Sequence, residues 1–160
     1  MNLIRWSVVA GILVAAGACS DSTAPTSGAR FGDIHLTVAA SSREVSRGSS
    51  QTFHVELVNE GSSAATLHFK DSCQIVPTIR NAFGEIVLPV GGDQACLTVL
   101  TQLTLLPGQP VVRDYTWTAG STGFLLGAPP TLLPAGSYFF TAEVPSDEAT
   151  LRVTIEVVLK

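Results

Sequence analysis

The sequence is poor in charged residues, and this scarcity excludes several classes of function. Charged residues make up 14% of the chain, against about 25% in typical soluble domains. The net charge is −4, and neither sign forms a long run. The chain therefore lacks the basic stripe of a nucleic-acid-binding protein and the acidic tail of a disordered segment.

The motifs of common enzymes and metal sites are also missing. The sequence contains no nucleophile elbow, HExxH helix, P-loop or GxGxxG turn. No CxxC pair or Cys/His spacing indicates zinc. His35, His54 and His68 are expected on outward faces of strands; they would form a surface metal site only if those strands were neighbours, and the simpler interpretation is three solvated side chains. We therefore predict a non-catalytic protein without cofactors.

The N-terminus resembles the signal of a bacterial lipoprotein. Arg5 precedes an apolar run at residues 6–16, which is shorter than the ~20 residues that a membrane-spanning helix needs. Small residues then lead to Cys19, as in a lipobox, with Ala16 standing where Leu is commonest. The resemblance implies removal of residues 1–18 and acylation of Cys19. The alternatives are an ordinary signal peptide with a coincidental cysteine and a membrane-spanning anchor.

Residues 19–30 are expected to hold a folded domain, residues 31–160, close to a membrane. After Cys19 the sequence SDSTAPTSGAR has no apolar periodicity, and its Ser, Thr, Gly and Pro are typical of a flexible tether. The residue after the cysteine is Ser20 and not Asp. By the sorting rules of lipoproteins in two-membrane bacteria, this implies the outer membrane. We expect an extracytoplasmic, lipid-anchored protein of the cell envelope.

Cys73 and Cys96 remain once Cys19 is assigned to acylation. In an oxidising compartment such a pair favours a disulfide, which would connect an edge strand to the run that begins at Leu97. The alternative is two buried free thiols.

Alternation of apolar and polar residues predicts strands throughout the mature chain, and no helix. The pattern is clearest at Phe53-His-Val-Glu-Leu57, where every second side chain shares one face. Pro77 indicates that its strand lies at an edge. The expected strands are 33–39, 51–59, 65–70, 74–80, 85–88, 97–106, 111–118, 137–144 and 149–158. This number and spacing predict an all-β, Ig-like two-sheet antiparallel sandwich with Greek-key connections.

Two features near the end of the chain suggest specific roles. Tyr138 follows Pro134-Ala-Gly-Ser, and it either forms a tyrosine corner or is a plain core residue. Between residues 120 and 134, the uncharged Phe124, Leu125 and Leu126 lie among Gly and Pro. This apolar triplet either closes over the end of the sandwich or anchors a partner.

Several short motifs in order resemble the BsuPI family of intracellular proteinase inhibitors, over roughly residues 45–145. They are Val58-Asn59, Phe83-Gly84, Leu106-Pro107-Gly108, Trp117 and Pro134-Ala-Gly-Ser-Tyr138. Asn81-Ala82 and Ala135 depart from the family pattern. The resemblance implies an Ig-like sandwich that binds a proteinase or another envelope protein. The alternatives are a structural or accessory envelope domain, and a carbohydrate- or ligand-binding sandwich in which Trp117 or Tyr115 is exposed.

Overall fold

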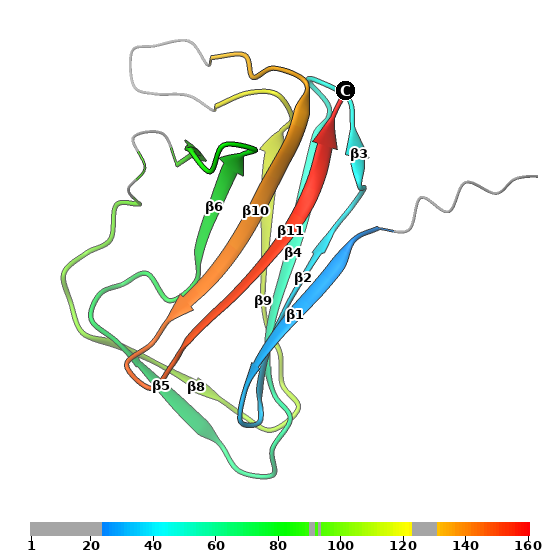
Figure 1. Ribbon diagram of the computed structural model, residues 1–160. Helices are drawn as coiled ribbons and strands as arrows, with labels where there is room; N and C mark the ends of the chain where they lie inside the picture. The colour runs from blue at the N-terminus through cyan, green and yellow to red at the C-terminus, as the bar shows by residue number, and fades with distance from the viewer. Residues whose placement is uncertain (1–23, 90–91, 93, 123–130) are drawn as a thin grey trace, which may run out of the picture.

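The structure is a computed structural model that describes residues 24–89, 92, 94–122 and 131–160. All regular elements in these residues are strands, and they form an all-β sandwich of facing sheets (Figure 1), which confirms the predicted fold class. The described part of the chain contains no helix with the length and apolar character of a membrane span. Cys19 and the triplet Phe124-Leu125-Leu126 lie outside the described residues, so their predicted roles stay predictions.

The first sheet has the strand order β1-β2-β4-β9 and is antiparallel throughout. Its strands are β1 (Thr26–Phe31), β2 (Ile34–Ala40), β4 (Ser50–Asn59) and β9 (Val111–Thr118). The predicted alternation is confirmed in β2 and β4, because their apolar residues are buried against the second sheet. These buried residues are Ile34, Leu36, Val38, Phe53, Val55 and Leu57.

Strand β1 corrects the prediction of a tether that extends to Arg30. It pairs with β2 over its whole length, from Thr26 opposite Ala39 to Phe31 opposite Ile34. Its side chains are exposed or half-buried, so the ladder of backbone hydrogen bonds holds the strand and leaves no apolar pattern in the sequence. The folded domain therefore begins before residue 31.

The second sheet has the strand order β3-β11-β10-β6-β7. Its strands are β3 (Glu44–Val45), β11 (Thr150–Leu159), β10 (Gly136–Pro145), β6 (Val76–Asn81) and β7 (Ile86–Leu88). The hairpin of β10 and β11 buries every second residue as predicted, and Arg152 Nε donates to Glu143 Oε2 across it at 2.8 Å. β3 pairs in parallel with β11 inside a segment predicted to be a connection.

The position of Pro77 partly confirms the predicted edge strand. β6 lies between β10 and β7, so it is not the outermost strand of its sheet. However, β7 pairs with β6 only at Ile79 and Arg80, and no described strand lies beyond Pro77 on that side. A proline is tolerated here because its missing N–H faces an unpaired edge.

Strands β5 (Ala65–Phe69) and β8 (Thr101–Leu105) form a separate two-stranded sheet across one end of the sandwich (Figure 1). Its Leu67, Phe69 and Leu105 are buried and close that end of the core. The strand predicted for residues 97–106 is therefore too long, because only its second half is a strand. The first half follows the disulfide at Cys96 and is held at Leu97 by hydrogen bonds to Ser72.

The core between the two large sheets is rich in aromatic contacts. Phe53 of β4 and Phe140 of β10 stack with their ring centroids 4.0 Å apart and their planes at 8°. Tyr138 is buried, and its hydroxyl donates to the carbonyl of Pro134 at 2.8 Å. This bond to backbone four residues upstream supports the tyrosine-corner interpretation over a plain core tyrosine.

Candidate protein-binding site

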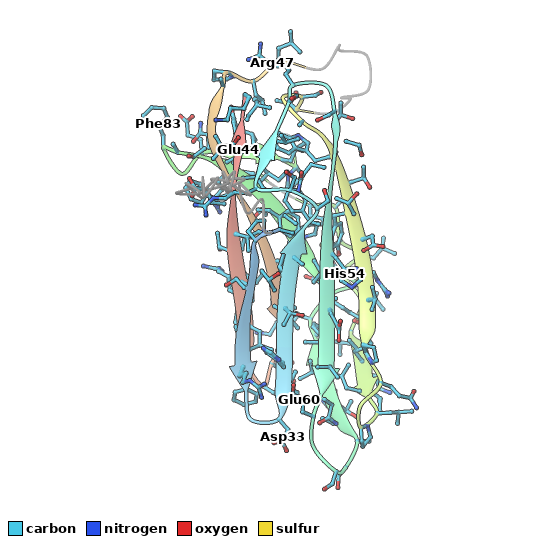
Figure 2. The ribbon with its side chains drawn as sticks, turned by 90° about the vertical axis from the view of Figure 1, so that its right-hand side faces the viewer. Asp33, Glu44, Arg47, His54, Glu60 and Phe83 are labelled. Carbon is cyan, nitrogen blue, oxygen red and sulfur yellow. A yellow bond between two sulfur atoms is a disulfide. The ribbon has the colours of Figure 1, made fainter. Side chains whose placement is uncertain are left out.

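The histidines do not form a common metal site. All three lie on outward faces as predicted, and Figure 2 shows His54 on the outer face of β4. Each imidazole lies beside its own carboxylate: His35 beside Glu60, His54 beside Asp114, and His68 beside Glu148. These three pairs lie at different places on the strands, so the histidines act as separate surface groups.

Among the described residues, Glu148 has the carboxyl group whose pKa is shifted most strongly. The backbone N–H of His68 donates to Glu148 Oε2 at 3.0 Å, and His68 Nδ1 lies 2.6 Å from Oε1. These two bonds, the backbone one first, lower the pKa of Glu148 from 4.5 to about 2. They connect the turn after β10 to β5, which belongs to the small end sheet.

Substituting Glu148 is expected to reduce stability in a pH-dependent way. Because the folded-state pKa is lowered, the ionised carboxylate stabilises the fold above pH 4.5, and this contribution is lost as the pH falls towards about 2. The stability difference between wild type and Glu148→Gln should therefore shrink over that interval. Urea unfolding from pH 7 to pH 2 and an NMR titration of the carboxyl would measure this. A midpoint near 4.5 would contradict it.

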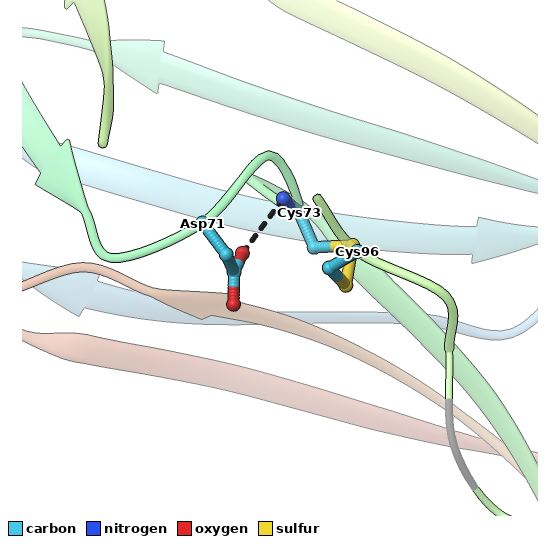
Figure 3. Close-up of side chains that lie close together, drawn as sticks. All are labelled: Asp71, Cys73 and Cys96. Atoms are coloured by element: carbon cyan, nitrogen blue, oxygen red, sulfur yellow. Dashed lines mark hydrogen bonds between the residues drawn. A yellow bond between two sulfur atoms is a disulfide. The ribbon is translucent and has the colours of Figure 1, made fainter. Parts of the chain in front are cut away.

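The predicted disulfide joins Cys73 to Cys96, with a Cα–Cα distance of 5.5 Å (Figure 3). Asp71 Oδ1 accepts a hydrogen bond from the backbone N–H of Cys73 at 2.8 Å. In the described residues, these three side chains are the one group of His, Cys, Asp and Glu compact enough for a metal ion. Because both sulfurs are bonded to each other, the arrangement is a structural crosslink, not a metal centre.

Residues 97–100, which we call the tethered segment, follow this disulfide directly. Leu97 is 73% exposed and Leu100 is 81% exposed. The backbone at Leu97 is nevertheless held by Ser72, whose N–H donates to the Leu97 carbonyl at 3.0 Å and whose Oγ accepts from the Leu97 N–H at 2.8 Å. Thr101 Oγ1 donates to the Asp71 carbonyl at 2.7 Å just beyond. The segment thus combines a fixed backbone with exposed aliphatic side chains.

An apolar groove of about 470 Å³ opens on the side of the sandwich where β9 faces β6 and β7. The side chains that line it are uncharged: Phe53, Pro77, Thr78, Ile79, Leu88, Pro89, Gln94, Ala95, Tyr115, Thr116, Trp117 and Phe140. Tyr115 is half-buried at this groove, and burial raises the pKa of its hydroxyl. The groove and the residues just before the tethered segment are contiguous, because Gln94 and Ala95 belong to both.

Trp117 does not provide the exposed aromatic surface that the carbohydrate-binding alternative needs. It is 3% exposed, and its Nε1 donates to the Ser121 carbonyl at 2.7 Å. The ring packs against Tyr138, with centroids 5.6 Å apart. Trp117 is therefore mainly a core residue.

The sequence did not reveal the tethered segment as a binding candidate. Its Leu, Thr and Val residues predict a strand, because hydropathy alone does not distinguish a strand from an exposed aliphatic segment. The available signal was the position of this run directly after a cysteine that a disulfide would fix.

The described residues form a β-sandwich with an apolar groove and an exposed, hydrogen-bonded tethered segment. The family model described as BsuPI, intracellular proteinase inhibitor, matches residues 37–149. The chain belongs to this family, as the motifs predicted. No curated protein is significantly similar to it in sequence.

The solved structures that are similar to the chain include two β-glucosidases, both much longer than this chain. A β-glucosidase, EmGH1 from Erythrobacter marinus, matches 86% of this chain and 16% of its own, at 12% identity and a TM-score of 0.46. A β-glucosidase from Listeria innocua in complex with gluconolactone matches 79% of this chain and 16% of its own, at 14% identity and a TM-score of 0.45. The chain spans about a sixth of the length of these enzymes.

Proposed function

We propose that the protein is a non-catalytic, proteinase-inhibitor-like binding module of the cell envelope, and that the tethered segment contacts the target. The observation that carries this proposal is the fixed backbone at Leu97 beneath highly exposed aliphatic side chains. Exposed apolar groups of this kind are typical of interaction sites. Membership of a family described as proteinase inhibitors supports a proteinase as the target.

The tethered segment suits a proteinase cleft for a physical reason. Such a cleft takes an extended peptide and places its side chains in pockets. A segment whose backbone is already ordered loses less conformational entropy on binding than a flexible substrate. Aliphatic side chains at Leu97 and Leu100 would fill apolar pockets, and the disulfide at Cys96 would keep the segment in place.

The double variant Leu97→Ser with Leu100→Ser is expected to weaken inhibition at least tenfold, which corresponds to about 1.4 kcal/mol of binding free energy. Its free energy of unfolding should change by less than about 0.5 kcal/mol, as for ordinary surface changes. Casein hydrolysis by serine, cysteine, aspartic and metallo-proteinases, with increasing amounts of the protein, would measure inhibition.

The matched control is Leu132→Ser, because Leu132 is also a leucine and is 70% exposed, but lies beside Ser121 away from the disulfide. It should inhibit like the wild type. No inhibition of any class by the wild type, or equal inhibition by all variants, would contradict the proposal.

The proposed envelope location depends on the leader and is supported by the disulfide, since disulfides persist in oxidising compartments. We expect wild-type protein to lose residues 1–18 and to gain a lipid at Cys19. The variant Cys19→Ser should not be lipidated. Intact-mass measurement of membrane and soluble fractions would test this, and identical unlipidated masses for both proteins would contradict it.

A further inference from the structure

We propose that the free edge of β9 and the apolar groove beside it bind an extended, uncharged peptide segment of another protein. This segment would add to the four-stranded sheet next to β9 and place one apolar side chain in the groove. The proposal is independent of the tethered segment, since it uses none of the residues 97–100.

The edge of β9 is available for such a strand. β9 pairs with β4 along its whole length, from Val111 opposite Leu57 to Thr118 opposite Ser50. Within the described residues, the backbone of residues 111–117 forms no hydrogen bond to any segment other than β4. One side chain does bind this backbone: Arg113 Nη1 donates to the Val112 carbonyl at 2.8 Å. Neither residue belongs to the groove lining. Figure 2 shows β9, in yellow, at the outer edge of its sheet.

Natural proteins usually protect an edge of this length. Common protective features are charged side chains, proline, a bulge or a covering segment. β9 has charges only at Arg113 and Asp114, before the residues that line the groove; it contains no proline or lysine and pairs with β4 in unbroken register. The opposite edge of the same sheet is different, because β1 packs against β11 of the facing sheet. The sandwich is thus closed along β1 and open along β9.

The geometry of added strands places a side chain into the groove. A new strand would lie about 4.8 Å beyond β9 in the plane of its own sheet, and the facing sheet would lie ~10 Å from it. Every second side chain of that strand would point towards the interior face, where Tyr115 and Trp117 of β9 line the groove. A volume of about 470 Å³ is in the range of ligand sites, roughly 300–1,000 Å³.

The lining determines the chemistry of the occupant. Among the described residues, no charged side chain lines the groove, so a charged group placed against them would be desolvated without a partner. Phe53 and Phe140 offer aromatic surface at the bottom, which favours an aromatic or aliphatic side chain. The facing edge of β6 competes poorly for the strand, because Pro77 has no N–H to donate. A peptide therefore fits better than a small apolar molecule, which would leave the edge of β9 unused.

The probe is the acetylated and amidated peptide STTFTTS, which carries no charge, and binding to the full exported protein is measured by calorimetry and by NMR. Two N-methylated versions of the peptide block the amides on one edge of the strand or on the other. One version should bind at least tenfold more weakly than the unmodified peptide, and the other about equally. Replacing the central phenylalanine of the peptide with serine should also weaken binding at least tenfold.

A matched pair of protein variants tests the location. Ala95→Trp adds an indole at the groove and should weaken peptide binding at least tenfold, whereas Ala82→Trp, in the β6–β7 turn outside the lining, should leave it unchanged. Both alanines are exposed, so both variants should fold. The proposal is overturned by no binding at about 1 mM peptide, by equal binding of both methylated versions, or by equal effects of the two tryptophans. The variant Leu97→Ser with Leu100→Ser should bind the peptide normally, which separates this result from the proposed inhibition.

Discussion

Phe140→Ala is expected to lower the free energy of unfolding by about 4 kcal/mol, as buried phenylalanine truncations do. Phe140 is 2% exposed and lies in the centre of β10. Its ring stacks on Phe53 of the opposite sheet and lies 6.0 Å from that of Tyr115. Removing it leaves a cavity between the two sheets, and it also removes an aromatic pair that contributes about 1 kcal/mol beyond its buried area.

The neighbouring residue provides the control for Phe140→Ala. Phe139 is the same residue type on the same strand, but it points to the outer face and is half-buried. Phe139→Ala should therefore cost roughly 1 kcal/mol, the average for point substitutions. Urea unfolding followed by far-UV circular dichroism would measure both. Equal losses for the two variants would contradict the assignment of Phe140 to a core that joins the sheets.

The strands that the sequence predicted best are those with one buried and one exposed face. β2, β4, β10 and β11 have this character, and their alternation is therefore visible in the sequence. β1 was missed because both of its faces are largely exposed, and β3 because it has only two residues. Such strands carry too little apolar pattern to be visible in the sequence, and the backbone groups that pair them are the same in every residue.

The candidate site was less predictable than the fold. The disulfide followed from two remaining cysteines, but the fixed and exposed state of Leu97 depends on bonds to Ser72, which is distant in sequence. The groove depends on which strands lie at the sheet edges. Alternation shows which residues of a strand face inward, but it does not give the order of strands in a sheet.

The family description and the proposed envelope location concern different parts of the chain. The family model begins at residue 37, so the predicted leader and β1 lie before the match. Cys73 and Cys96 lie inside it, and their disulfide suits an oxidising compartment. We infer that this chain presents the family's sandwich outside the cytoplasm. Its disulfide would not persist in a reducing compartment.

Replacing both Cys73 and Cys96 with alanine is expected to lower the free energy of unfolding by about 3 kcal/mol. The crosslink connects residues separated by 23 positions, and a closed loop of that size restricts the unfolded chain by this amount in the chain-entropy model. Urea unfolding of the wild type with and without reductant, compared with the double variant, would measure the effect. Reductant should lower the stability of the wild type to that of the variant and leave the variant unchanged.

Because the hydrogen bonds between Ser72 and Leu97 remain, the variant should still fold, but with a less ordered tethered segment and weaker inhibition. Equal stability of the wild type and the variant without reductant would show that the disulfide does not constrain the fold.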